Sequence, residues 1–388
     1  MKKFEKFSAD ENNSKWGNIL KREEPLYDSS SDIRSDFERD YNRIIHSTGY
    51  RRLKHKTQVF FSPENDHICT RGEHVTHVES ISYTIAKYLG LNTELTKAIA
   101  TAHDLGHSPF GHQGERILSE ISKRDINENF WHERNGIVRV DKLELLEDRF
   151  GNKRNLDLTY AVRDGIISHC GEIDENKLRP REECIDLYEY NYPNEYAPYT
   201  WEGCVVKISD KISYLGRDII DAVTLGILDE DLDELKRIFH CDINNSVIIS
   251  DLVYDLCRNS SPETGLCFSE EKFKMLNELK QFNYKNIYLS DKTMASNQYF
   301  KLVLNTIYDF LKDLYKNRKR ALRVCAELVF DFEEWLSNYW NWERSEKNKN
   351  LAIFTMEDET SFYRAIIYYI SGMTDNYAIE TFNKIISF

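Results

Sequence analysis

Residues 74–111 have the sequence HVTHVESISYTIAKYLGLNTELTKAIATAHDLGHSPFG. Apolar side chains recur every three or four positions in the first half, which predicts a helix with one buried face. Gly90 predicts the end of that helix, and Thr93 is expected to cap a second helix that runs up to His103. The closing run GHSPFG holds one proline and two glycines, which excludes regular helix. The stretch therefore indicates two helices followed by an irregular turn.

The rest of the chain has mostly the same helical spacing. Further helices are expected over residues 156–169, 205–228, 299–315, 320–340 and 361–386. Residues 179–198 and 343–350 are expected to be loops, and only residues 57–61 show alternation typical of a strand. The fold class is therefore mainly α.

Composition narrows the class of protein. The chain has 388 residues, of which 41% are hydrophobic, with only 7 prolines and 16 glycines, which favours one large folded domain or a compact pair. No apolar run approaches the roughly 20 residues that cross a bilayer, so no membrane partner is expected. The N-terminus lacks the apolar segment of a signal peptide, and the 8 cysteines form no C-x-x-C pair. We therefore expect reduced thiols and a cytoplasmic location. The net charge of −13 disfavours general nucleic-acid binding through bulk charge.

Histidines and acidic residues suggest a metal site. Nine of the 11 histidines lie between His46 and His132. Neighbouring residues on a helix diverge by roughly 100°, so His103 and Asp104 can share one ion only where the helix ends, as the glycine–proline turn predicts. His74 and Asp210 lie on other predicted helices at spacings that let them join this pair. Two imidazoles and two carboxylates suit Mn, Fe, Mg, Co or Zn.

The helix that carries Asp210 has two different faces. Asp210, Tyr214, Asp218 and Asp221 share one stripe, and apolar residues share another. A solvated acidic face is the competing interpretation of this stripe.

Short motifs resemble a known family over nearly the whole chain. They are FERDYNRII (37–45), YRRL (50–53), KTQV (56–59), ENDH (64–67), TR (70–71), HDLGH (103–107), PFGHQGE (109–115), GIISH (165–169), GMTD (372–375) and YA (377–378). With His74 and Asp210, they resemble the HD-domain phosphohydrolases and, more narrowly, the deoxynucleoside triphosphate triphosphohydrolase (dGTPase-like) family. The resemblance implies an HD-domain helical core at residues 61–228, an N-terminal helical and basic segment at 1–60 that contributes to the active site and to oligomer contacts, and additional C-terminal helices at 229–388.

The resemblance also implies an activity and its residues. The family splits a dNTP into a deoxynucleoside and inorganic triphosphate. The implied metal ligands are His74, His103, Asp104 and Asp210, the implied proton donor is His112 with Glu115 holding its imidazole, and the implied substrate contacts are Gln58, Arg71, His107, His132, Lys211, Tyr214 and Asp218. His77 competes with His74, but a gapless match to the family from residue 66 through residue 92 favours His74. Cys69, Gly72, Glu73, Glu133 and Tyr368 depart from the family pattern, which bears on substrate preference and regulation.

Cofactor and partners follow from the same resemblance. A divalent ion (Mn²⁺, Mg²⁺, Fe²⁺ or Co²⁺) is expected, together with a dNTP substrate. Relatives commonly form oligomers, often hexamers built from dimers, and some are activated by dNTPs or respond to single-stranded DNA. Two alternatives stay open: an HD-domain phosphohydrolase that acts on another nucleotide, and a catalytically idle protein that senses nucleotides or single-stranded DNA.

Overall fold

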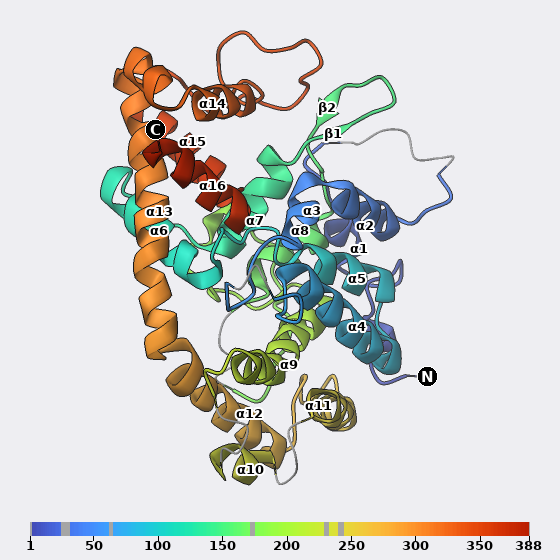
Figure 1. Ribbon diagram of the computed structural model, residues 1–388. Helices are drawn as coiled ribbons and strands as arrows, with labels where there is room; N and C mark the ends of the chain where they lie inside the picture. The colour runs from blue at the N-terminus through green and yellow to red at the C-terminus, as the bar shows by residue number, and fades with distance from the viewer. Residues whose placement is uncertain are drawn as a thin grey trace.

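The computed structural model describes residues 2–24, 32–61, 65–170, 175–228, 233–239 and 244–387, and it is mainly α, as the sequence predicts (Figure 1). Residues 25–31 of the predicted N-terminal segment and 229–232 at the predicted C-terminal boundary lie outside this part. The first helices are α1 (Trp16–Ile19), α2 (Asp36–His46), α3 (Thr48–Leu53), α4 (Arg71–Leu89), α5 (Thr93–Ala102), α6 (Gly111–Asp125), α7 (His132–Val138), α8 (Tyr160–Ser168) and α9 (Trp201–Thr224). They are followed by α10 (Asp233–Phe239), α11 (Asn245–Asn259), α12 (Glu270–Asn283), α13 (Asp291–Lys316), α14 (Arg318–Leu336), α15 (Glu359–Ser371) and α16 (Asp375–Ile386). Within the described residues, the one sheet is the antiparallel pair β1 (Leu146–Glu147) and β2 (Lys153–Arg154).

Local sequence explains where α4 and α5 begin and end. Thr70 and Glu73 form a capping box at the start of α4, and Gly90 ends it with a left-handed φ of 91°. The predicted cap of α5 is wrong by one residue: Asn92, not Thr93, caps it, because the Asn92 side chain accepts from the amides of residues 94 and 95. As predicted, α5 ends at Ala102, immediately before His103.

Helices α4, α5, α8 and α9 pack together and carry most of the candidate site. Val78 of α4, Ile99 of α5 and Ile166 of α8 are fully buried in one hydrophobic cluster. The same cluster includes Phe37 and Leu53, so the N-terminal helices α2 and α3 are part of this core. Burial of apolar surface therefore holds the four helices in fixed register.

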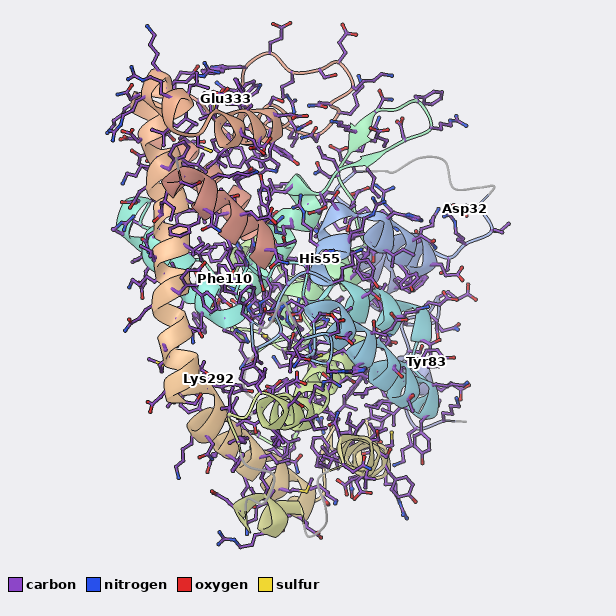
Figure 2. The ribbon with its side chains drawn as sticks, in the orientation of Figure 1. Asp32, His55, Tyr83, Phe110, Lys292 and Glu333 are labelled. Carbon is purple, nitrogen blue, oxygen red and sulfur yellow. The ribbon has the colours of Figure 1, made fainter. Side chains whose placement is uncertain are left out.

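Helices α13 to α16 form a second cluster with α6, whereas α10, α11 and α12 pack with α4 and α9 in a third. The long helix α13 runs along one side of the molecule, with α6, α15 and α16 beside it (Figure 1). Phe110, which precedes α6, lies between α13 and the helices of the core (Figure 2), and its ring stacks on Phe300 of α13 at 4.3 Å. This packing joins α13 to the turn that precedes His112.

Some predicted elements differ from the structure. Residues 361–386 are not one helix, because Gly372 ends α15 and Thr374 caps a separate helix, α16. Residues 57–61 are not a strand; Thr57 makes only an isolated bridge to Thr70. None of the helices in the described ranges is both long and apolar enough to cross a bilayer.

Candidate active site

Three helices bring the predicted ligand set together. Helix α4 supplies His74, the end of α5 supplies His103 and Asp104, and α9 supplies Asp210. Nε2 of His74 lies 2.9 Å from Oδ1 of Asp210 and 3.7 Å from Oδ2 of Asp104. Nε2 of His103 lies 3.6 Å from Oδ1 of Asp104 and 3.9 Å from Oδ1 of Asp210. Four residues whose ligand atoms converge in this way could coordinate one ion.

The hydrogen bonds of the two imidazoles prepare them as ligands. Nδ1 of His103 donates to the carbonyl of Ala100 at 2.6 Å, which leaves a lone pair on Nε2. That Nε2 is buried and has no hydrogen-bond partner among the described residues. Nδ1 of His74 faces the hydroxyl of Ser213, which donates its own proton to the carbonyl of Asp210. The donor set therefore fits a divalent cation.

Buried charge keeps both carboxyl groups ionised. Burial alone would raise the pKa of Asp104, but the Arg71 guanidinium, 2.7 Å away, and the imidazoles of His103 and His107 outweigh it and hold that pKa well below its usual range. Burial likewise opposes ionisation of Asp210, but the hydrogen bond and charge of His74 lower its pKa to about 2. Both groups thus offer carboxylates at neutral pH.

His169, at the end of α8, lies beside this cluster, although the sequence predicted no role for it. Its Nε2 is 3.9 Å from Oδ1 of Asp104, and its Nδ1 donates to the carbonyl of Ile166 at 2.7 Å. Burial, with the nearby His103 and His132, lowers the pKa of His169 to about 3, so the ring is neutral. No local sequence pattern indicates that a single histidine after a helix will lie beside a metal cluster. The one available indication was that His169 belongs to the motif GIISH.

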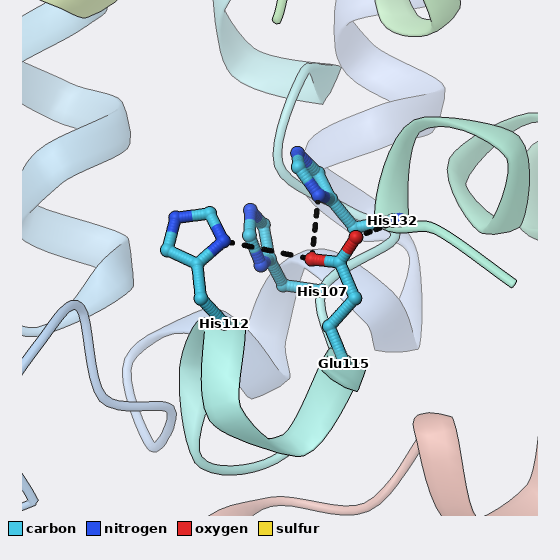
Figure 3. A group of neighbouring side chains, drawn as sticks. All are labelled: His107, His112, Glu115 and His132. Carbon is cyan, nitrogen blue, oxygen red and sulfur yellow. Dashed lines mark hydrogen bonds and ion pairs between the residues drawn. The ribbon is translucent and has the colours of Figure 1, made fainter. Parts of the chain in front are cut away.

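A second group of side chains surrounds Glu115 on α6 (Figure 3). Oε2 of Glu115 lies 2.9 Å from Nδ1 of His132 and 3.5 Å from Nδ1 of His112, and Oε1 accepts from the backbone amide of His132. The ring of His107 stacks on His132 at 3.8 Å. Burial opposes ionisation of Glu115, but His132 and His112 hold its pKa well below the usual range. The predicted partner of His112 therefore also binds His132, and more closely.

One cavity of about 370 Å³ connects these groups. The predicted residues that line it are Gln58, Arg71, His74, Asp104, His107, His112, Asp210, Lys211, Tyr214 and Asp218. His103 and His132 are buried and do not line it, and Glu115 lines a neighbouring cavity together with His112. His77 is half-buried outside both the cavity and the possible metal-ligating groups of the described chain.

Several lining residues had no role predicted from the sequence. They include Arg116, His169, Cys170, Lys207 and Tyr288. The hydroxyl of Tyr288 donates to Oδ2 of Asp218 at 2.5 Å, and burial raises the pKa of Asp218 to about 7. Nζ of Lys207 donates to the carbonyls of Ser168 and Cys170. Nothing in the local sequence separates these side chains from ordinary core polar residues.

Comparisons with known proteins show the family of this chain. Residues 71–215 match the HD domain model, a span that contains all four predicted ligands. A deoxyguanosinetriphosphate triphosphohydrolase-like protein of Caldanaerobacter subterraneus subsp. tengcongensis is 34% identical over 91% of this chain and 86% of its own length. Proteins with the same description from Rickettsia prowazekii (32% identical over 95% of this chain and 94% of their protein) and Rickettsia bellii (32% over 91% and 92%) are also similar. This chain belongs to the deoxyguanosinetriphosphate triphosphohydrolase-like family of HD-domain proteins.

Proposed function

We propose that the chain hydrolyses deoxynucleoside triphosphates, dGTP or several dNTPs, to a deoxynucleoside and inorganic triphosphate. The observation that carries the proposal is the single cavity in which an acidic and imidazole ligand set, two cationic side chains (Arg71 and Lys211) and the imidazoles beside Glu115 meet. The names of the similar proteins support the same substrate class.

A divalent ion fits the proposal at His74, His103, Asp104 and Asp210. Oxygen and imidazole donors favour Mn²⁺, Mg²⁺, Fe²⁺ or Co²⁺. An ion bound there would neutralise phosphate charge and lower the pKa of a water molecule. Arg71 holds the carboxylate of Asp104 at 2.7 Å, and its buried Nε has no hydrogen-bond partner among the described residues. Arg71 can therefore both orient a ligand and contact a phosphate oxygen.

The 5′-oxygen of the deoxynucleoside is a poor leaving group and needs a proton. The ring of His112 is 67% exposed and lines the cavity, and its Nδ1 faces Oε2 of Glu115 at 3.5 Å. This contact leaves Nε2 to carry a proton toward the substrate. His112 is therefore proposed as the proton donor, and Glu115 as the carboxylate that orients it. His107 and His132 are proposed to contact the phosphates.

Sugar selection is assigned to α9. Tyr214 and Asp218 follow Asp210 by one and two helical turns, and all three line the cavity. Tyr288 occupies one oxygen of Asp218, so a 3′-hydroxyl would use the other. If the ring of Tyr214 packs beside C2′ of the sugar, it excludes a 2′-hydroxyl sterically. Gln58 is proposed to contact the sugar or base, since its buried Oε1 lacks a hydrogen-bond partner in the described part of the chain.

Regulation and assembly belong to the proposal by family resemblance. We propose a cytoplasmic homo-oligomer, dimer-based or hexameric, with a dNTP activator or single-stranded DNA as effector. The seven cysteines within the described residues are all free, which supports a reducing location.

Product analysis tests the proposed reaction. The purified chain is incubated with each of four dNTPs and four NTPs, singly and mixed, with Mn²⁺ or Mg²⁺, and the products are separated by chromatography. Deoxynucleoside with intact triphosphate supports the proposal. A different cleavage pattern would assign the chain to another HD-domain phosphohydrolase activity, and absence of turnover in every mixture would favour the idle nucleotide-binding alternative.

A further inference from the structure

Cys170 lies between two imidazoles at the wall of the cavity. Its Sγ is 3.2 Å from Nε2 of His132 and 3.4 Å from Nε2 of His169. The side chains of Cys170 and His169 line the cavity, so an ion can reach them from there. The three ligand atoms lie within 4.8 Å of one another.

The imidazole of His169 presents a lone pair to this sulfur. Nδ1 of His169 is committed as a donor to the carbonyl of Ile166, which can only accept. Nδ1 of His132 faces two carboxylates, Glu115 at 2.9 Å and Glu133 at 3.3 Å, which fixes its proton on that side. The two Nδ1 atoms thus have fixed partners, and both Nε2 atoms face the sulfur.

We propose that His132, His169 and Cys170 form a second cation site, which takes a thiophilic divalent ion of the Zn²⁺ type. In a tetrahedral zinc site, bonds of about 2.0–2.3 Å place neighbouring ligand atoms roughly 3.5 Å apart. The two measured nitrogen–sulfur distances, 3.2 and 3.4 Å, are close to that spacing before any adjustment. The fourth position would face the cavity.

The surroundings of the three ligands resemble the outer contacts of known zinc sites. A carboxylate on the far nitrogen of a ligating histidine orients the ring and raises its basicity, and Glu115 occupies that place on His132. Glu133 adds a second buried carboxyl group, whose Oε2 has no hydrogen-bond partner among the described residues. Nζ of Lys207 holds the carbonyls of Ser168 and Cys170, which fixes the backbone beneath the sulfur.

Sulfur separates this site from the first one. Two carboxylates and two imidazoles suit Mn²⁺ or Mg²⁺, whereas a thiolate with two imidazoles selects softer ions. On binding, the S–H bond breaks, its proton leaves to solvent, and the thiolate donates its electron pair to the ion; a proton on Nε2 of His132 must leave as well. No change of oxidation state is involved.

Occupancy of the second site has a consequence that rests on the proposed function. An ion there uses the Nε2 atom of His132 and narrows the cavity beside His107. Zn²⁺ would then inhibit dNTP hydrolysis even when the first site holds Mn²⁺. The binding claim itself does not depend on which reaction the chain catalyses.

Metal binding to the full-length chain tests the site directly. Equilibrium dialysis against Zn²⁺ and titration with Co²⁺ are compared for the wild type, Cys170→Ser and Asp210→Ala. The control is Cys184→Ser, which changes an exposed cysteine. We expect a near-ultraviolet thiolate-to-cobalt absorption in the wild type, in Asp210→Ala and in the control, and its loss in Cys170→Ser with one fewer Zn²⁺ per chain. Glu115→Gln should weaken Zn²⁺ binding about 10- to 100-fold.

Circular dichroism of each variant verifies that it is folded, and Cys170→Ala replaces Cys170→Ser if the latter is not. Absence of the absorption in the wild type, or an unchanged absorption and stoichiometry in the folded Cys170 variant, would overturn the proposal. Because Asp210→Ala is expected to keep the second ion, a failure of the proposed hydrolysis and a failure of this site give different results.

Discussion

The carboxylate of Asp375 accepts a hydrogen bond of 2.9 Å from the backbone amide of Phe110, although 265 positions separate the two residues. Its other oxygen accepts from the amide of Thr57 at 2.8 Å. Phe110 has a left-handed φ of 61°, which is uncommon for a residue with a side chain. One buried carboxylate of α16 thus fixes both the turn before His112 and the segment that carries Gln58.

We expect Asp375→Asn to lower stability and turnover together. An amide has one acceptor atom, so its NH₂ group would face one of the two backbone amides, at a cost of about 1–3 kcal/mol in the free energy of unfolding. Denaturant unfolding and kcat measure the two effects, and metal content should not change. Asp358→Asn is the control, because it exchanges one good helix cap for another at an exposed position. Equal stability of Asp375→Asn and wild type would contradict this role.

Asp210→Ala should abolish binding at the first cation site and dNTP hydrolysis while leaving the helical content intact. The Asp210 carboxylate faces His74 and His103, so its removal deletes a ligand and leaves two imidazoles without their charged partner. Elemental analysis and circular dichroism measure the outcome. Asp221→Asn, on the same helix but facing the amide of Cys69, should keep the ion. Stoichiometric Mn²⁺ and full activity in Asp210→Ala would remove Asp210 from the ligand set.

His112→Ala should lower kcat by roughly 10²–10⁴-fold, the usual scale for loss of a general acid, with nucleotide and metal binding preserved. His77→Ala, which changes a half-buried histidine outside the cavity, is the control. Because Glu115 lies closer to His132 than to His112, His132→Ala is measured alongside. If His112→Ala weakens affinity with unchanged kcat while His132→Ala removes turnover, the proton donor is His132.

Tyr214→Ala should lower the ratio of kcat/KM for dNTPs to kcat/KM for NTPs. The factor of this decrease should exceed the factor by which bound metal per chain decreases. A buried site that offers an added 2′-hydroxyl no hydrogen-bond partner binds the ribonucleotide less favourably, by on the order of 1–3 kcal/mol. This difference corresponds to roughly a 5- to 150-fold preference for the deoxynucleotide. The measurement is kcat/KM for dGTP and GTP on the wild type and the variant. Equal wild-type values for the two nucleotides would refute sugar selection by α9.

Asp218→Asn should stabilise the folded chain more at pH 8 than at pH 5. Burial raises the pKa of Asp218 to about 7, whereas an unfolded aspartate titrates near 3.9. Between those values the unfolded chain loses a proton that the folded chain keeps, so wild-type stability falls as pH rises through this window and then levels off. The asparagine variant lacks this loss, which is on the order of a few kcal/mol. If the difference in Tm between variant and wild type is the same at both pH values, the pKa of Asp218 is not raised in the folded chain.

Local pattern was sufficient for several elements. The spacing of apolar residues around Val78 and Ile99 predicted α4 and α5, and Gly90 predicted the end of α4, because helix periodicity and a left-handed cap depend on neighbouring residues only. The glycine–proline turn also predicted that α5 would end at His103. The prediction of a single helix over 361–386 was wrong. The apolar spacing continues across Gly372, and only the cap at Thr374 reveals the break between α15 and α16.

The sequence by itself determined the helical class and, through its motifs, the family and a list of candidate residues. The tertiary structure alone decided which of those residues share a cavity, that Glu115 lies closer to His132 than to His112, and that His169, Cys170 and Tyr288 stand beside them. The physical reason is the separation along the chain over which each interaction acts. Capping and periodicity act over a few residues, whereas the contacts of Asp375 and Cys170 join helices far apart in the chain and exist only once apolar burial has packed those helices together.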